Sequence, residues 1–256
     1  MKILVTGATG RAGRYLAKGL AARFDVAAGV GIGFEHPTLR GLGPEFPDVP
    51  VYESAAAAIE KHHPDAVVDF TAEPAFVKNG PLYVEKRVPM VVGTTGVDRA
   101  FLEDLGRQAK AVGIGMIVAP NFSIGAVLMM KYAREAAKHF TTAEIIEIHH
   151  PGKKDAPSGT ALATAQSFGG SGLKDASESV EKVPGSRGGK VGEVRVHSMR
   201  LPGISAYQKV FLTSAGEWLT IEHTAMSAEA YVPGVALALE RVRSVQGLVF
   251  GLDSLL

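Results

Sequence analysis

The feature that most constrains the fold is a regular alternation of short apolar runs with helical patterns over residues 2–119. The apolar runs resemble buried parallel strands and lie at residues 2–6, 25–30, 65–70, 89–92 and 114–119. The helical patterns between them run from a glycine-rich turn to about Arg23 and over residues 54–63, 74–86 and 98–111, the last with Asp98 as N-cap. Alternation at this spacing predicts an α/β domain with a doubly wound parallel sheet and right-handed crossovers.

After Asn121 the pattern changes, because strand signals follow one another without helices between them. A long helix is expected at 122–140, a strand at 144–150 and a helix at 158–168. Three strands then come in succession, at 191–201, 206–213 and 218–223. Consecutive strands joined by turns predict a C-terminal α+β domain with a mixed, mostly antiparallel sheet.

The end of the chain is expected to return to the first domain. A last helix is predicted at 228–242, and the tail at 248–256 should pack with it. The predicted domains are therefore 1–121 together with 228–256, and 122–227. Residues 169–190 form a connection rich in Gly, Ser and charge, of a length that is usually functional or mobile.

Composition excludes several classes of function. The 27 Lys and Arg are balanced by 26 Asp and Glu, which argues against nucleic acid as a partner. Because there is no cysteine, disulfides, thiolate metal sites, iron–sulfur clusters and cysteine nucleophiles are excluded, and no metal site is expected. No apolar stretch is long enough to span a membrane and no signal-peptide pattern is present, so we expect a cytoplasmic protein without a membrane partner.

Gly7, Gly10 and Gly13 follow the first strand and open a helix. Glycines in this context allow a tight turn, so that the pyrophosphate of a dinucleotide can sit on the helix N-terminus, as in Rossmann-like domains. An ordinary strand–helix turn is the alternative, and the pattern has one residue more between its first two glycines than the usual fingerprint. The flanking strand, the alternation downstream and the N-terminal position favour the cofactor site.

The choice between NAD and NADP stays open. The end of the second strand in this fold usually carries an acidic residue for the ribose hydroxyls, or a nearby Arg when the ribose is phosphorylated. Here residues 26–33 carry neither charge. Glu35, His36 and Arg40 follow a few residues later and are candidates to substitute.

A second informative segment, residues 147–162, combines groups that suit proton transfer and anion binding. His149 and His150 are adjacent at a strand end, so their side chains point to opposite faces and are not expected to chelate one metal. A histidine moves protons near neutrality, and Lys153 or Lys154 offers either a cation for a carboxylate or a proton for a developing anion. Ser158 is a candidate N-cap of a helix whose first N–H groups can hold an anion. The alternative is a turn with one core histidine, two solvated lysines and an ordinary cap.

This segment is similar to the substrate signature of the 4-hydroxy-tetrahydrodipicolinate reductases, long called dihydrodipicolinate reductases. The matching string is His149-His150-Pro151-Gly152-Lys153-Lys154-Asp155-Ala156-Pro157-Ser158-Gly159-Thr160-Ala161-Leu162. Other segments resemble further parts of the family in the same order: Gly93-Thr94-Thr95-Gly96, Ala119-Pro120-Asn121-Phe122-Ser123-Ile124-Gly125, Val196-His197-Ser198-Met199-Arg200-Leu201-Pro202-Gly203, and Gly247-Leu248 with Gly251-Leu252. The resemblance spans essentially the whole chain.

The resemblance implies a set of site residues. His149 would be the proton donor or acceptor and Lys153 a second proton donor, while His150, Gly159 and Thr160 would bind the substrate. The residues implied for the cofactor are Gly7, Ala8, Thr9, Gly10, Arg11 and Ala12, then Gly93, Thr94 and Thr95, then Ala119, Pro120, Asn121 and Phe122.

The reaction implied is reduction, with loss of water, of the small cyclic dicarboxylate 4-hydroxy-tetrahydrodipicolinate by NADH or NADPH, in the diaminopimelate route to lysine. Residues 122–227 would then bind substrate and form a homotetramer. The alternatives are a related nicotinamide-dependent reductase of another imine or keto acid, and a non-catalytic dinucleotide sensor. Intact His149, His150 and Lys153 argue against the sensor, and the Pro-Ser-Gly-Thr string argues against the other reductase.

For two further residues, Thr71 and Trp218, the sequence leaves two interpretations open. Thr71 follows the third strand and either faces the cofactor or caps the next helix. Trp218 lies on a predicted strand and serves either the core or a subunit interface.

Overall fold

The computed structural model describes residues 1–175 and 179–256. The chain divides into two compact units, each described here by itself. The N-terminal unit comprises Met1–Ile124 and Ala228–Leu256, and the inserted unit comprises Gly125–Ser227. No helix in these described parts is both long and apolar enough to cross a membrane.

The N-terminal unit is built on a seven-stranded sheet in the order β12-β6-β5-β4-β1-β2-β3, and every pairing is parallel. Its strands are β1 Lys2–Thr6, β2 Asp25–Val30, β3 Val51–Tyr52, β4 Ala66–Asp69, β5 Met90–Val92, β6 Gly115–Val118 and β12 Gly247–Phe250. The predicted doubly wound parallel sheet is confirmed. Because β1 lies between β2 and β4, the order of the strands reverses beside β1, which is where such sheets bind ligands.

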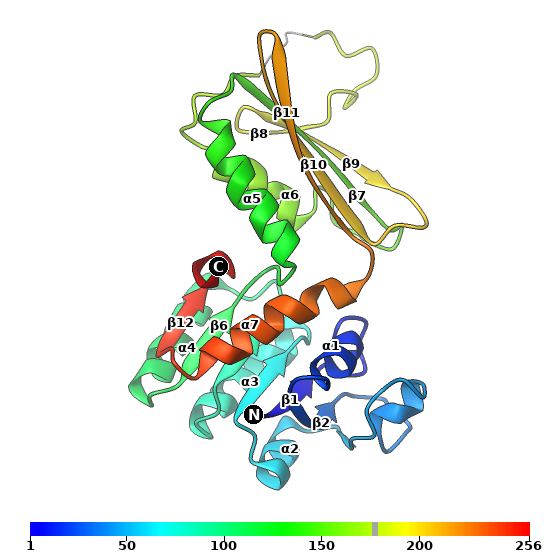
Figure 1. Ribbon diagram of the computed structural model, residues 1–256, viewed down its shortest axis with the longest axis vertical. Helices are drawn as coiled ribbons and strands as arrows, with labels where there is room; N and C mark the ends of the chain where they lie inside the picture. Colours follow the sequence, from blue (N-terminus) through cyan, green and yellow to red (C-terminus); the bar gives the residue numbers. More distant parts are fainter. Residues whose placement is uncertain (176–178) are drawn as a thin grey trace. The chain divides into compact units, whose positions relative to one another are not determined.

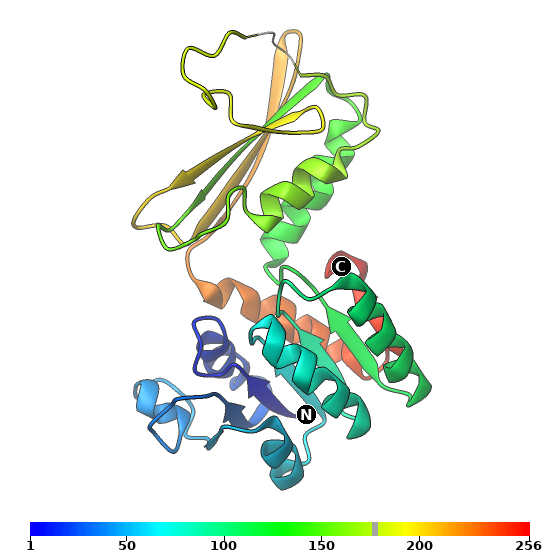
Figure 2. The ribbon, with the colours of Figure 1, turned by 180° about the vertical axis from the view of Figure 1, so that it is seen from behind.

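Helices cover both faces of this sheet (Figures 1 and 2). They are α1 Gly13–Leu20, α2 Ala55–His62, α3 Glu73–Glu85, α4 Arg99–Ala111 and α7 Val232–Val242, with short 3-10 turns η1 Leu39–Leu42, η2 Ala228–Tyr231 and η3 Asp253–Leu255. The apolar sides of α2, α3 and α4 pack on one face, and α1 and α7 lie together on the other. Asp98 caps α4 as predicted, because its carboxylate accepts from the Phe101 N–H at 3.0 Å.

The end of the chain completes this sheet. Strand β12 pairs in parallel with β6, and α7 buries Val235, Ala238 and Leu239 against the sheet. The tail therefore packs with the N-terminal unit. That the tail supplies a strand was not predicted, and neither was the two-residue strand β3.

The inserted unit contains a five-stranded sheet in the order β11-β10-β7-β9-β8. Its strands are β7 Thr142–His149, β8 Gly189–Val191, β9 Val194–Arg200, β10 Ala206–Ser214 and β11 Glu217–Ala225. Strands β7 and β9 pair in parallel and the other neighbours are antiparallel, so the predicted mixed sheet is confirmed. The single strand expected at 191–201 is wrong at its start: Gly192, with φ +60°, turns the chain, and β9 begins only at Val194.

Helices α5 Ile124–Ala137 and α6 Gly159–Ser167 lie on one side of this sheet in both ribbon views (Figures 1 and 2). Small residues such as Ala133 and Ala161 let the helices approach the strands, where Ile145, Val210 and Leu212 complete the core. The other face carries Trp218, which is 71 % exposed and lies 6.0 Å from the ring of Phe211. Trp218 is therefore outside the core of this chain.

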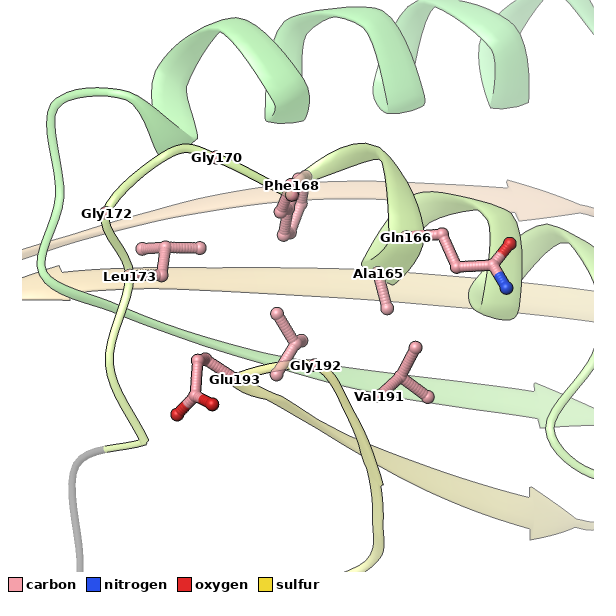
Figure 3. Close-up of a pocket in the computed structure, with 11 residues that line it drawn as sticks. Ala165, Gln166, Phe168, Gly170, Gly172, Leu173, Val191, Gly192 and Glu193 are labelled. Carbon is pink, nitrogen blue, oxygen red and sulfur yellow. The ribbon is translucent and has the colours of Figure 1, made fainter.

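A cavity of about 330 Å³ lies in the inserted unit between the end of α6 and the turn that joins β8 to β9 (Figure 3). Its walls are mostly apolar and include Phe168, Leu173 and Val191, with Glu193 at its edge. None of the residues implied for substrate or cofactor lines it. Part of the connection at 169–190, residues 176–178, lies outside the described residues.

Candidate active site

The turn after β1 leaves no room for a side chain at Gly7 or Gly13. Gly7 has φ +79°, and a Cβ on it would lie 2.3 Å from the carbonyl oxygen of Phe70. A Cβ on Gly13 would lie 2.0 Å from the carbonyl oxygen of Gly7. The N–H groups of Gly7 and Ala8 both donate to the Val30 carbonyl, at 2.9 and 3.0 Å, which holds the turn against β2. A ligand at this turn would therefore meet backbone atoms at the glycine positions.

Helix α1 starts directly after this turn, and its N-cap residue Ala12 makes no side-chain capping bond. A helix start without a side-chain cap suits an anion, because backbone N–H groups and the helix dipole can then face the ligand. Gly10 and Arg11 are exposed beside it, whereas the Ala8 side chain is fully buried. The loop thus fits a pyrophosphate held through its backbone.

Two more of the implied cofactor segments lie at the same edge of the sheet. Gly93–Thr95 follows β5 and Ala119–Phe122 follows β6, and these strands are neighbours. Because the strands are parallel, their carboxyl ends meet at the edge where the glycine turn also lies. Thr95 and Pro120 are exposed there.

Other members of these two loops have structural contacts. Phe122 is 1 % exposed, and its ring lies 5.5 Å from that of Phe70. The side-chain oxygen of Asn121 accepts from the Ser123 N–H at 2.8 Å. Ala119 is buried and donates its N–H to the Val92 carbonyl.

A buried carboxylate at the end of β4 ties the loops together. Asp69 is fully buried, and its Oδ1 accepts from the hydroxyls of Thr94 at 2.8 Å and Thr71 at 2.7 Å. Its Oδ2 accepts from the hydroxyl of Tyr83 at 2.8 Å. Helix α3 is capped at Ala72, not Thr71, so the capping interpretation of Thr71 is wrong. Thr94 is 5 % exposed, and its hydrogen bond to Asp69 fixes the loop after β5.

The stretch after β2 gives no further indication of the ribose ligand. Glu35 and His36 are exposed on the segment before η1, and Arg40 is exposed within η1. The ring of His36 packs edge-on against Phe34 at 5.4 Å.

In the inserted unit, His149 is the last residue of β7, and its ring is bound to a buried acid. Nδ1 of His149 lies 2.5 Å from Oε2 of Glu147, two residues earlier on the same face of the strand. Glu147 is fully buried, and its Oε1 accepts from Nη1 of Arg200 at 3.0 Å. Burial by itself raises the pKa of Glu147, but hydrogen bonds from His149, Ser198 and Arg200 outweigh it and lower the pKa below its usual value.

Lys153 lies in the turn after β7, at the same end of the strand. Its ammonium contacts both carboxylate oxygens of Asp155, at 2.8 and 2.9 Å. This bond lowers the pKa of Asp155. Lys154, the other candidate cation, is exposed.

Helix α6 begins next to these groups. Ser158 is its N-cap as predicted, accepting from the Ala161 N–H at 3.2 Å. The N–H of Ser158 donates to Oε1 of Glu147 at 3.3 Å. Gly159 is exposed and Thr160 half-buried at the first turn. The structure therefore brings His149, Lys153 and the start of α6 into one region of the inserted unit.

Sequence reasoning assigned no role to Glu147, Asp155 or Arg200. A signal for Glu147 was present, because an acid two residues before a strand histidine lies on the same face. Arg200 gave no such signal, since it is 53 residues away and reaches Glu147 only through the pairing of β7 with β9. Within the described residues no group of His, Asp and Glu is arranged to hold a metal ion.

Comparison with known proteins gives full-length matches. Residues 1–122 match the model for the N-terminus of dihydrodipicolinate reductase, and residues 125–256 match the model for its C-terminus. The chain is 44 % identical to the 4-hydroxy-tetrahydrodipicolinate reductase of Moorella thermoacetica, covering 100 % of this chain and 98 % of that protein. It is 38 % identical to that of Listeria innocua, with 100 % of both covered.

A solved structure agrees with these relatives. The dipicolinate-bound dihydrodipicolinate reductase from Paenisporosarcina sp. TG-14 superposes with a TM-score of 0.86 at 32 % identity. The match covers 100 % of this chain and 99 % of that one. Both units therefore have counterparts in one solved relative.

Proposed function

The chain belongs to the dihydrodipicolinate reductase family, and from this premise we propose which of its residues carry out the reduction of 4-hydroxy-tetrahydrodipicolinate to tetrahydrodipicolinate. Its activity is that of a 4-hydroxy-tetrahydrodipicolinate reductase, an enzyme of lysine and diaminopimelate biosynthesis. The observation that carries the assignment of roles is the placement of His149, Lys153 and the start of α6 together in the inserted unit.

The family uses a nicotinamide dinucleotide, and the N-terminal unit fits one. A Cβ at Gly7 or Gly13 would collide with backbone, so only glycine permits this turn, and the uncapped start of α1 suits a pyrophosphate. Gly7–Ala12 would hold the pyrophosphate, and the loops at 93–95 and 119–122 would hold the nicotinamide side. When bound, NADH or NADPH supplies the hydride.

The inserted unit would bind the substrate and handle its protons. A dicarboxylate needs N–H or cationic partners, which the first turn of α6 at Gly159 and Thr160 provides, and Lys153 would be a second proton donor beside it. His149, oriented by a carboxylate, would exchange a proton with the substrate, and His150 would contact the ring. The Lys153 ammonium has three N–H donors, so it can keep its contact with Asp155 and still donate toward the substrate.

The assay uses substrate generated enzymatically and follows loss of absorbance of NADH and, in parallel, of NADPH. We expect turnover that depends on the substrate and on the cofactor, and the ratio of kcat/KM values gives the cofactor preference. Oxidation of neither cofactor with this substrate would contradict the proposed activity.

We also propose that the inserted unit forms a homotetramer through the outer face of its sheet. This face carries Trp218, Phe211 and Met199 in an exposed or half-exposed state, and Ile146 and Ile148 lie on it in register. An exposed apolar patch of this kind is typical of an interface. Light scattering should give the mass of four chains, and Trp218→Glu should lower it; a wild-type mass of one chain would contradict the proposal.

A further inference from the structure

Glu147 is the carboxylate around which the expected catalytic groups of the inserted unit are arranged. It is fully buried on β7, and each of its oxygens has a protein partner. Oε2 bonds Nδ1 of His149 at 2.5 Å, while Oε1 accepts from Arg200 at 3.0 Å and from the Ser158 N–H at 3.3 Å. Ser198 also hydrogen-bonds Glu147. A charge taken this far from water needs such partners, and His149, Arg200 and Ser158 belong to three different parts of the site.

We propose that Glu147 is a positioning residue that fixes the tautomer and orientation of His149 and, through Arg200, the loop that carries Lys153. This inference rests on the role proposed above for His149, which it makes more specific. Glu147 itself would not touch the substrate.

The tautomer follows from the hydrogen-bonding capacity of the two groups. An ionised carboxylate can only accept, so Nδ1 of His149 must carry the proton that bonds to Oε2. In the neutral ring the other nitrogen, Nε2, is then left with a lone pair. The structure thus assigns Nε2 as the atom of His149 that takes or gives the proton during turnover.

Arg200 extends the same control to the loop after β7. It is the register partner of His149 on β9, which sets its guanidinium beside Glu147. Its Nε donates to the Lys153 carbonyl at 3.3 Å and its Nη2 to the Asp155 carbonyl at 2.5 Å. One planar guanidinium therefore joins the buried carboxylate to the backbone on both sides of Lys154.

The same strand offers a matched control. Glu144 also bridges a histidine and an arginine, since Oε2 bonds Nε2 of His197 at 2.8 Å and Oε1 accepts from Arg187 at 2.6 Å. Its side chain is 28 % exposed and lies on the opposite face of the sheet from Glu147. Removing its charge disturbs an equivalent cluster without touching His149.

The test compares Glu147→Gln with Glu144→Gln, using ¹⁵N NMR of the histidine rings and steady-state kinetics. In Glu147→Gln the side-chain oxygen must take the position of Oε1, because Arg200 and Ser158 both donate there. The amide NH₂ then takes the position of Oε2 and faces His149. Nδ1 must then accept, and the proton moves to Nε2. We therefore expect the tautomer of His149, assigned by comparison with His149→Gln, to invert.

Turnover should follow the tautomer. We expect kcat of Glu147→Gln to fall roughly 10- to 100-fold, because a misprotonated ring loses much of a general acid–base contribution. Affinity for NADH, which binds to the N-terminal unit, should be unchanged. Glu144→Gln should keep the tautomer of His149, and it should keep kcat at wild-type mass, which light scattering checks because Glu144 lies on the outer face proposed for assembly. An unchanged tautomer in Glu147→Gln would overturn the proposal.

A double variant separates this proposal from the proposed function. If Glu147 acts through His149, adding Glu147→Gln to His149→Gln should cost less kcat than Glu147→Gln costs alone, because only the effect through Arg200 on the Lys153 loop remains. Additive losses would overturn the positioning role. If His149→Gln alone keeps full turnover, the role proposed for His149 fails, and the NMR result still decides whether Glu147 sets its ring. Should Glu147→Gln not fold, Glu147→Asp keeps the charge, and it should retain the wild-type tautomer with a smaller loss of kcat; an inverted tautomer in this variant would refute the inference.

Discussion

Replacing Tyr83 with Phe removes one hydroxyl from the buried network below the cofactor loops. Tyr83 is fully buried in α3, and its hydroxyl donates to Oδ2 of Asp69 at 2.8 Å. Burial, and next the charge of Asp69, raise the pKa of Tyr83 well above its usual value. The hydroxyl is therefore a neutral donor to a carboxylate throughout the physiological range.

The cost of the substitution can be worked from these contacts. The phenyl ring fills the same space, so the main change is the loss of the hydrogen bond to a charged group, about 1.5–3 kcal/mol, together with a longer contact of 3.3 Å with Oγ1 of Thr6. For a chain of this size each kcal/mol lowers the melting temperature by about 2–4 °C, so Tyr83→Phe should melt about 3–12 °C below wild type. Thr71 and Thr94 still donate to Oδ1, so NADH affinity should change by less than about threefold.

The assay is thermal unfolding followed by circular dichroism, with NADH titration on the same samples. Tyr132→Phe is the matched control, because Tyr132 is 56 % exposed. Loss of its hydroxyl should change the free energy of unfolding by no more than about 0.5 kcal/mol. A melting temperature for Tyr83→Phe equal to that of Tyr132→Phe would refute the reasoning, since it would mean that Asp69 does not depend on this donor.

Three more predictions follow from the same structure. Lys153→Ala should lose most turnover while the Kd for NADH is kept, and intact turnover would remove Lys153 from its role. Gly7→Ala should weaken NADH binding and lower stability together, because its Cβ would lie 2.3 Å from the Phe70 carbonyl at φ +79°; calorimetry measures both, and wild-type values would contradict the turn geometry. Folding lowers the pKa of Glu147 from its unfolded-state value near 4.5, so the ionised carboxylate stabilises the fold at any pH above 4.5. This stabilisation is lost as the pH falls below 4.5 and through the folded-state pKa. The difference in melting temperature between wild type and Glu147→Gln should therefore shrink below about pH 4.5, and a difference independent of pH would count against this.

Local patterns were sufficient to predict most of the fold. The central strands β1, β4, β5 and β6 are almost wholly buried and form continuous apolar runs. Caps such as Asp98 and Ser158 mark helix starts within one turn. Strand β3 escaped prediction because two residues carry no periodicity. Strand β12 escaped because its partner β6 lies far away in sequence, so that pairing and not local pattern defines it.

The site was predictable only in part, for a related reason. His149, Lys153 and Ser158 lie within one short segment, so the sequence itself places them together. Their supports come from elsewhere: Arg200 arrives through β9, and Asp69 joins Thr94 through neighbouring strands. Roles that depend on non-local pairing have no signature in the spacing of residues along the chain.

The place of β12 in the sheet also affects how this protein is made. Strand β6 is synthesised long before Ala228–Leu256, so a nascent chain of the first 124 residues has an unpaired strand edge at β6. It also lacks α7, which lies with α1 on one face of the sheet. The inserted unit is continuous in sequence, so it can fold before the last segment of the N-terminal unit, Ala228–Leu256, has been synthesised. A chain that terminates after the inserted unit would expose the unpaired edge of β6, with which strands of other chains can pair.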